Sequence, residues 1–262
     1  MSAIIIENEI VHYEVLGRGR PLIFVHGWVG SWRYWVPTMQ SVSSAYRAYA
    51  LDLWGFGDTS KSNSRYTLQE QVNLLERFLE EMGIGKIALI GHGLGAIVAL
   101  LYVRQFPHLV DRVMAIGYPM RENALNKRLT TSPPEELEKW LLAGTPLSDM
   151  ARLEARKTDA QAIVHSILNL QELDLKGLSR EVNIPCLFVH GLNDPAIMVP
   201  NGNKIEAFAE NFHLVIFENS GHYPMLSQPN KFNRLLNDFL ALDSGESPRN
   251  LQLKDEWKRR VR

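Results

Sequence analysis

The sequence is poor in several features that mark special classes of protein. Cys186 is the only cysteine among 262 residues, which excludes an internal disulfide framework and fits a reducing compartment. No apolar run approaches the roughly 20 residues that span a bilayer. The stretch MSAIIIENEIVHYEV lacks a basic leader, so we expect no signal peptide and a cytoplasmic protein. The formal net charge of −1 favours neither nucleic acid nor an anionic membrane as a partner.

The order of apolar segments predicts an α/β protein. The hydrophobic content of 45% and the charged content of 22% are ordinary for a globular chain with a real core. Short strand-like runs alternate with longer helix-like segments, which implies a mainly parallel sheet with helices on both faces. In residues 67–82, apolar positions recur at helical spacing. Thr67 with Glu70 forms a capping-box pattern at the start of that helix.

Residues 121–182 break this alternation. They contain no strand-like run, but they contain helix-like pieces at 134–143, 147–155 and 159–173. We therefore predict a helical cap inserted into an α/β core of residues 1–120 and 183–242, over one end of the sheet. Such a cap offers a surface for a protein partner. The polar residues 243–262 are expected to form a surface helix or a frayed end.

Four loops directly follow predicted strands. Ligands in an open parallel sheet bind beyond the carboxyl ends of the strands, so these loops should converge on one site. Their sequences are His26-Gly27-Trp28, Gly91-His92-Gly93-Leu94-Gly95, His190-Gly191-Leu192-Asn193-Asp194 and Asn219-Ser220-Gly221-His222.

This set of loops resembles the α/β-hydrolase family over about residues 10–242, on the side of its serine hydrolases. In that family a nucleophile lies in G-x-S-x-G between a strand and a helix, and an acid and then a histidine follow later strands. Asp194 matches the acid and His222 matches the base. The nucleophile position departs from the pattern, since GHGLG has Gly93 where the family has serine. Residues 52–61, DLWGFGDTSK, match the family's loop after the preceding strand.

The resemblance implies most of a catalytic apparatus. Asp194 would orient the imidazole of His222 and stabilise its charged form, and the backbone N–H groups of Trp28 and Leu94 would form the oxyanion hole. None of these groups depends on a side chain at position 93, and the missing side chain should leave room for a water beside His222. The residues expected to line a substrate pocket are His26, Gly27, Trp28, Phe56, His92 and Trp140. The other histidines show no metal-ligand spacing, so we expect no metal, and no cofactor is implied.

Simpler interpretations of the same residues exist. Asp194 fits a turn in Asn193-Asp194-Pro195, and His222 fits a satisfied core histidine. The run from Gly91 to Ala96 also matches the dinucleotide fingerprint G-x-G-x-x-G/A. That fingerprint requires an acidic residue at the end of the next strand, but Asp111 precedes that strand. The dinucleotide interpretation also leaves Asp194 and His222 unexplained.

Three functional hypotheses follow from glycine at position 93. In the first, the protein is an enzyme in which His222 acts as a general base on a small, partly apolar substrate, without a covalent nucleophile. In the second, Gly93 replaces the serine of a serine hydrolase, by design or by drift. In the third, the protein is a non-catalytic member of the fold that binds a small molecule or a protein partner. Fold alone constrains function too loosely to decide among them.

Overall fold

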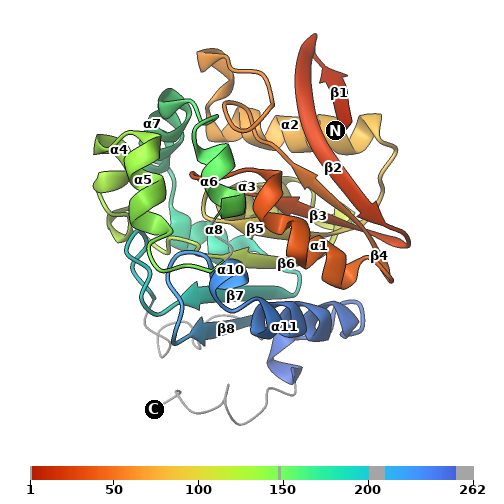
Figure 1. Cartoon of the computed structure of the whole chain (residues 1–262). Coiled ribbons are helices and arrows are strands. Elements are labelled where there is room, and N and C mark those ends of the chain that lie inside the picture. The colour runs from red at the N-terminus through yellow and green to blue at the C-terminus, as the bar shows by residue number, and fades with distance from the viewer. Residues whose placement is uncertain (1, 147–148, 201–209, 252–262) are drawn as a thin grey trace.

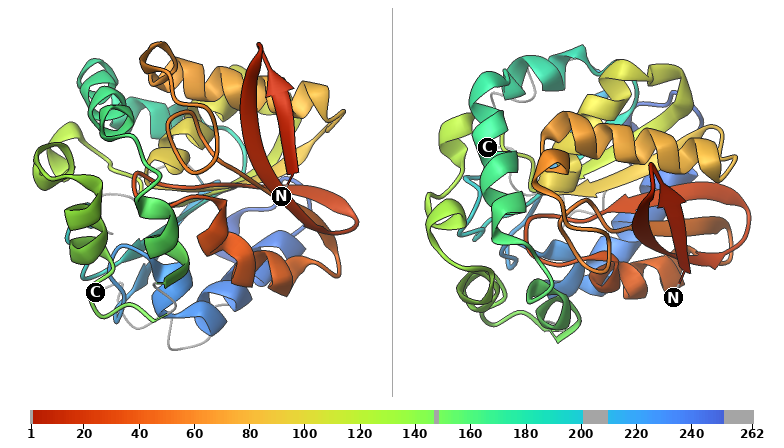
Figure 2. Two further views of the ribbon diagram at one scale, coloured as in Figure 1. Left: turned by 45° about the horizontal axis from the view of Figure 1, so that its top comes forward. Right: turned by 90° about the horizontal axis from the view of Figure 1, so that it is seen from above.

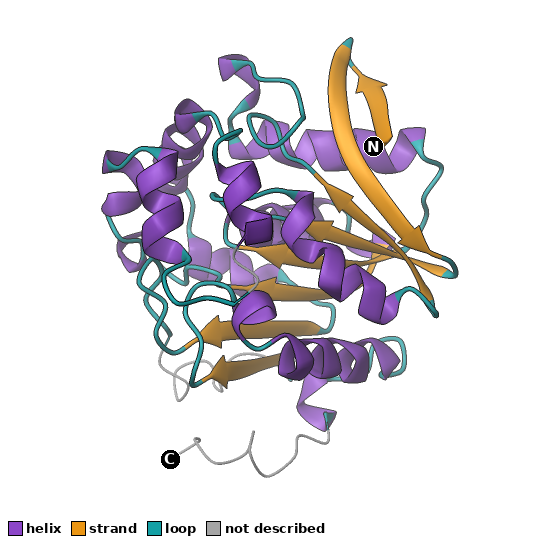
Figure 3. Ribbon diagram, in the orientation of Figure 1, coloured by secondary structure: helices purple, strands orange, loops and turns teal. Residues whose placement is uncertain are grey.

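A single central sheet organises the chain (Figure 1). The structure is a computed structural model that describes residues 2–146, 149–200 and 210–251. The described strands form one sheet in the order β1-β2-β4-β3-β5-β6-β7-β8. Figure 3 shows these strands as an inner layer between helices. Their bounds are β1 Ser2–Ile6, β2 Glu9–Gly17, β3 Arg20–Val25, β4 Tyr46–Leu51, β5 Ile87–His92, β6 Val110–Ile116, β7 Cys186–Gly191 and β8 Phe212–Phe217.

The sheet is parallel except at its amino-terminal edge. β1 pairs antiparallel with β2, and β2 pairs antiparallel with β4. From β4 onward every neighbouring pair is parallel. The carboxyl ends of β3, β5, β7 and β8 therefore meet at one edge, as the sequence predicted. The mainly parallel α/β fold is confirmed.

Helices cover both faces of the sheet (Figures 1 and 2). α1 and α11 pack against each other on one face, while α2, α3 and α8 lie together on the other. Every residue of α3 from Leu94 to Val103 is buried, because this helix is enclosed by the sheet and by its two neighbours. The bounds on these faces are α1 Val36–Val42, α2 Leu68–Glu81, α3 Leu94–Gln105, α8 Leu175–Glu181, α10 Pro224–Ser227 and α11 Pro229–Ala241. Short 3₁₀ turns connect them, at Trp32–Trp35, Asn63–Arg65 and Pro107–Leu109.

The connection between β6 and β7 is helical over its described residues. α4 to α7 gather at the end of the sheet towards which the arrows of the parallel strands, such as β7 and β8, point in Figure 1. Three of these helices correspond to the predicted pieces, although residues 147–148 lie outside the described residues. The sequence did not predict α4 or α8. The bounds are α4 Arg128–Thr131, α5 Pro134–Leu141, α6 Asp149–Ala155 and α7 Ala160–Asn169, with 3₁₀ turns at Glu122–Ala124 and Leu170–Glu172.

Two local predictions meet a mixed outcome. The Thr67 hydroxyl accepts a hydrogen bond from the Glu70 backbone N–H at 3.2 Å, but the Glu70 carboxylate pairs with Arg65 at 2.8 Å. Thr67 thus caps α2 as predicted. The Glu70 carboxylate, which the capping box would direct to the Thr67 backbone N–H, is bound to Arg65 instead.

The carboxyl-terminal segment differs from the expected surface helix or frayed end in its described part. The buried Arg112 guanidinium donates to the carbonyl oxygens of Leu242 at 2.8 Å and Asp243 at 3.1 Å. A 3₁₀ turn follows at Pro248–Asn250. A buried guanidinium requires hydrogen-bond acceptors. The carbonyl groups of Leu242 and Asp243 supply them, and these hydrogen bonds hold the chain directly beyond α11. Residues 252–262 lie outside the described residues. None of the described helices combines the length and apolar character needed to cross a lipid bilayer.

Candidate active site

The turn between β5 and α3 is sharp because two glycines allow backbone to touch backbone. A Cβ on Gly91 would lie 2.2 Å from the carbonyl oxygen of Gly95, and a Cβ on Gly95 would lie 2.3 Å from that of Val25. Gly93 stands between them at the N-cap of α3 with φ 53° and ψ −111°. This backbone conformation is sparsely populated by residues with a side chain. Position 93 therefore has a backbone conformation that glycine adopts without strain and that a residue with a side chain would adopt only at a cost.

The loop after β3 lies directly against this turn. The Gly95 N–H donates to the His26 carbonyl at 3.0 Å, which fixes the loop to the start of α3. Among the described residues, neither the Trp28 N–H nor the Leu94 N–H has an acceptor. The first N–H groups of a helix have no partner within the helix and attract anions. These two amides are free to bind a negatively charged oxygen, and their assignment as an oxyanion hole stays a prediction.

Asp194 and His222 form a buried hydrogen-bonded pair. His222 Nδ1 lies 2.9 Å from Asp194 Oδ2, and both side chains are almost fully buried. The other carboxylate oxygen accepts from the backbone N–H groups of Ala196 at 2.8 Å and Ile197 at 3.1 Å. Burial opposes ionisation of Asp194, but the charge and hydrogen bond of His222 and these two N–H groups lower its pKa overall.

The second ring nitrogen of His222 is left without a partner. Its Nε2 is buried and has no hydrogen bond among the described residues. With an ionised Asp194 accepting from Nδ1–H, the neutral ring carries its lone pair on Nε2. The ring is thus held in the tautomer that a general base needs.

His92 connects three loops of the site. Its Nδ1 lies 3.0 Å from the Tyr34 hydroxyl, which also accepts from the Gly27 N–H at 2.7 Å. Its Nε2 donates to the His222 carbonyl at 2.9 Å, and burial holds the pKa of His92 well below its usual value. His92 is therefore a neutral structural link that fixes the backbone on both sides of the site.

The other predicted pocket residues have mixed surroundings. His26 uses both ring nitrogens, one on the Gly27 carbonyl at 2.8 Å and one on the Leu53 N–H at 3.0 Å. Phe56 is buried against the His26 ring. Trp140 lies on α5, half-buried, beneath the guanidinium of Arg128. Their assignment to a substrate pocket stays a prediction.

The space beside position 93 is narrower than the sequence suggested. A Cβ at Gly93 would lie 3.3 Å from Cε3 and 3.4 Å from Cζ3 of Trp28. The Trp28 side chain is fully buried, and its Nε1–H donates to the Ser166 hydroxyl of α7 at 3.0 Å. The expected room for a water is thus partly filled by the Trp28 indole. A contact over this sequence separation could not be seen in the sequence.

Comparisons with known proteins show to which family the chain belongs. A sequence profile of the family described as alpha/beta hydrolase fold matches residues 20–155, more than half of the chain. The chain belongs to the α/β-hydrolase fold family.

Members of the family similar to this chain include two curated enzymes. One is the 2-hydroxy-6-oxo-6-(2'-aminophenyl)hexa-2,4-dienoic acid hydrolase of Metapseudomonas resinovorans, 25% identical over 87% of each chain. The other is the pimeloyl-[acyl-carrier protein] methyl ester esterase of Nitrosomonas europaea, 24% identical over 85% of this chain and 96% of the relative. The solved structure of E-2-(acetamidomethylene)succinate hydrolase superposes with a TM-score of 0.80 at 20% identity, over 92% of this chain and 98% of that one.

Sequence reasoning missed three residues around the candidate site. Tyr34 and Tyr223 pack on the His92 ring, and the Tyr223 hydroxyl donates to the Val29 carbonyl at 2.7 Å. Tyr34 belongs to the aromatic stretch SWRYW, and Tyr223 directly follows the base, so both had a weak signal. Ser166 had none, since it lies within a helical segment of ordinary composition.

A cluster of one histidine on β2 and two aspartates on the loop after β4 could be mistaken for a metal centre. Ligand atoms of His12, Asp52 and Asp58 lie within 4.8 Å of one another. However, the Asp52 carboxylate accepts from the backbone N–H of Trp32 at 2.8 Å and from His12 at 3.0 Å. Asp58 is paired with Lys157 at 2.8 Å. Because these acceptors are already used, we assign the cluster to bracing the loop of residues 52–61.

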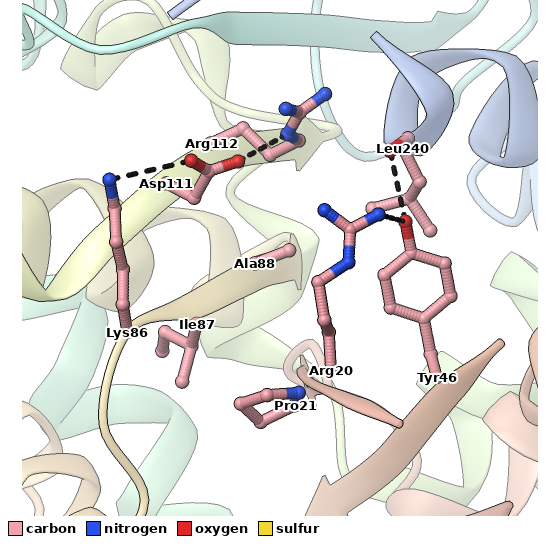
Figure 4. A pocket seen from close by; sticks show the side chains of 9 residues that line it. All are labelled: Arg20, Pro21, Tyr46, Lys86, Ile87, Ala88, Asp111, Arg112 and Leu240. Atoms are coloured by element: carbon pink, nitrogen blue, oxygen red, sulfur yellow. Dashed lines mark hydrogen bonds and ion pairs between the residues drawn. The ribbon is translucent and has the colours of Figure 1, made fainter. Parts of the chain in front are cut away.

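A pocket of about 170 Å³ lies at the opposite edge of the sheet, at the amino ends of β3 and β5 (Figure 4). Asp111 pairs there with Lys86 at 3.4 Å and with Arg112 at 2.7 Å. Arg20 donates to the Tyr46 hydroxyl at 2.9 Å. These charged groups have partners and tie the sheet to α11, so we assign this pocket to structure rather than to chemistry.

Buried histidines make stability depend on pH. Burial lowers the pKa of His26, His92 and His190 in the folded chain, that of His190 to about 4. The unfolded chain keeps values near 6.5 and binds more protons below that pH, so the free energy of unfolding falls as the pH drops from about 6.5 towards 4. His190 alone should contribute about 2–3 kcal/mol to this fall. Chemical denaturation at pH 8 and pH 4.5 measures it.

His190→Phe isolates one part of this pH dependence. Both ring nitrogens of His190 are buried and lack partners among the described residues, so the variant removes a titrating group and breaks no described hydrogen bond. Its stability should fall less between pH 8 and pH 4.5. The exposed His108 provides the control, and His108→Phe should keep the full fall. An unchanged fall in His190→Phe would contradict the assignment.

His12 acts in the opposite direction: burial opposes its protonation, but Asp52 raises its pKa overall. The stability that protonated His12 contributes is lost as the pH rises through the raised pKa of His12 in the folded chain.

Proposed function

We propose that the chain is a hydrolase-type enzyme in which His222 acts as a general base without a covalent nucleophile. The observation that carries the proposal is the buried, unpartnered Nε2 of His222 on a ring fixed by Asp194. Leaving a buried acceptor unpaired costs free energy. A site that bears this cost and also orients the ring is suited to take a proton from a ligand.

The proposed reaction is direct attack on a carbonyl carbon. His222 Nε2 removes a proton from water while the water oxygen bonds to that carbon. The carbonyl oxygen becomes negatively charged and accepts from the N–H groups of Trp28 and Leu94. The tetrahedral intermediate collapses, the bond to the leaving group breaks, and Nε2 returns the proton to the leaving group. No atom of residue 93 forms a covalent bond to the substrate in this reaction.

We infer that the substrate is a small, partly apolar carbonyl compound. The family relatives named above are hydrolases of a dienoic acid and of a methyl ester. The site is surrounded by buried aromatic side chains, such as Trp28, Tyr34 and Tyr223, which suit an apolar ligand. Residues 121–182, at the carboxyl ends of the strands, are proposed to act as its cap.

One observation favours a second candidate, a non-catalytic binding protein. The indole of Trp28 packs against Gly93 and takes space that a reacting group would use. In this alternative the site binds a small molecule, or residues 121–182 bind a protein, and His222 is a structural residue.

Hydrolysis assays with three substrate classes test the proposal. The panel contains short-chain esters, lactones and 2-hydroxy-6-oxo-dienoates, assayed with the native chain, His222→Ala and the exposed-site control His108→Ala. We expect at least one class to be hydrolysed by the native chain and by His108→Ala, and His222→Ala to lose about 10²–10⁴-fold in rate. Equal rates in His222→Ala and the native chain would sink the proposal. Saturable binding without hydrolysis would favour the second candidate.

A further inference from the structure

We infer that the indole of Trp28 shields the base nitrogen of His222, with Ser166 as the latch that holds the shield closed. The inference deepens the proposed function and rests on it in one respect, that the shielded nitrogen is the one that meets substrate. The shield itself concerns only how far solvent and small reagents can reach His222 Nε2. It is testable whether or not the chain turns over a substrate.

The contacts of Trp28 place its ring over the turn. The six-membered edge of the indole lies 3.3–3.4 Å from the point where a side chain at position 93 would begin. His92, the residue before Gly93, packs against His222 with ring centroids 4.6 Å apart and the two rings tilted by 56°. The Nε2 of His222 is buried without a polar partner. The rings of His92 and Tyr223 pack on His222, and the buried Trp28 ring fills the space at the adjacent position 93.

A single hydrogen bond from α7 holds the indole in place. The Trp28 Nε1–H donates to Ser166 Oγ at 3.0 Å, and Ser166 in turn donates to the Ile163 carbonyl at 2.8 Å. Helix α7 has other attachments to the core, since Asp159 accepts from the Tyr66 hydroxyl at 2.7 Å and Asn169 accepts from the Leu68 N–H at 3.1 Å. Removing the Ser166 hydroxyl therefore releases the indole without releasing α7.

The shield gives Trp28 a role in substrate selection. A carbonyl group can reach both His222 and the amides of Trp28 and Leu94 only when the indole edge leaves Gly93 or when the ligand is thin enough to fit beneath it. The side chain at position 28 then limits the size of the acyl group that can reach His222. The backbone N–H of the same residue donates a hydrogen bond to the negatively charged oxygen. Trp28→Ala should favour bulkier acyl groups over smaller ones in kcat/KM.

Modification by diethyl pyrocarbonate, followed by peptide mass spectrometry, tests the shield directly. The reagent acylates accessible imidazole nitrogens, and the exposed His108 provides an internal reference. In the native chain His222 should react far more slowly than His108. Ser166→Ala and Trp28→Phe should each raise the His222 rate roughly 3- to 10-fold, the change in open population that loss of one net hydrogen bond gives. Trp28→Ala should raise it further.

Two controls separate the shield from general loosening. Ser179→Ala removes another buried serine of residues 121–182, whose hydroxyl donates to the Lys176 carbonyl at 2.8 Å and is not the acceptor of the Trp28 Nε1–H. This variant should leave the His222 rate unchanged. The buried His12 reports on the rest of the core. The inference is overturned if His222 reacts no faster in Ser166→Ala, Trp28→Phe and Trp28→Ala. It is also overturned if His12 accelerates in parallel with His222. Both results are independent of whether the hydrolysis panel finds a substrate.

Discussion

Gly93→Ser is expected to make the chain react with a fluorophosphonate at residue 93, where the native chain has no side chain to label. The new hydroxyl would stand on the nucleophile turn, with His222 as its base and the amides of Trp28 and Leu94 as its anion site. These are the elements that activate a serine in acyl transfer. The expected change is from no labelling to covalent labelling, which intact mass and peptide mapping both measure.

The same substitution should lower stability. A side chain at φ 53° costs about 1–3 kcal/mol of strain, and its Cβ would lie 3.3 Å from Trp28, so the ring must yield by a few tenths of an ångström. Chemical denaturation of Gly93→Ser and Gly93→Ala should show similar losses, because both carry the Cβ. Only the serine variant should be labelled.

A double variant is the control for this prediction. The variant that combines Gly93→Ser with His222→Ala should still fold. Its residue 93 should be labelled far more slowly than in Gly93→Ser alone, because the hydroxyl then lacks its base. If Gly93→Ser folds but remains unlabelled, the turn is not a nucleophile turn lacking only its side chain. The hypothesis that Gly93 replaces the serine of a serine hydrolase would also fail.

Asp194→Asn is expected to reverse the tautomer of His222 and so abolish its action as a base. One carboxylate oxygen of Asp194 accepts from the N–H groups of Ala196 and Ile197. The amide oxygen of an asparagine must take that place, which turns its NH₂ group towards His222 Nδ1. Nδ1 then accepts, and the proton of the neutral ring moves to Nε2. A rate that depends on His222 should fall by about 10⁴-fold, as in a known protease triad.

Two measurements follow this change. The rate of fluorophosphonate labelling in the Gly93→Ser background reports the loss of base action, and ¹⁵N NMR of the histidine ring reports the tautomer. Asp174→Asn is a matched control, since Asp174 also accepts from a backbone N–H, that of Gly177 at 2.9 Å, away from the site. A labelling rate that survives Asp194→Asn would show that the pair does not orient the base.

The parts of the site that sequence could predict are those encoded by short segments. Glycines at 91 and 95 are required by backbone contacts of 2.2–2.3 Å, so the turn leaves a clear pattern. Asp194 and His222 follow β7 and β8, two neighbouring parallel strands, and the parallel topology brings their loops together. Their hydrogen bond at 2.9 Å follows from that arrangement. The strands of the sheet were equally readable, because buried parallel strands are short apolar runs.

The parts that sequence could not predict depend on contacts between distant segments. The position of the Trp28 ring is set by Ser166 on α7, and a helical pattern does not show which residue on its inner face meets the core. Tyr34 acquires its role only by lying between Gly27 and His92. For the same reason the room beside position 93 was overestimated, since a missing side chain says nothing about which neighbour fills the space.

The most direct test of base catalysis without a nucleophile is pre-steady-state mass spectrometry of the native chain with a substrate from the panel. Base catalysis without a nucleophile predicts product formation from the first turnover without a burst, no acyl adduct on the intact protein, and loss of turnover in His222→Ala. A covalent acyl-protein that accumulates and decays with the reaction, or full turnover in His222→Ala, would contradict it.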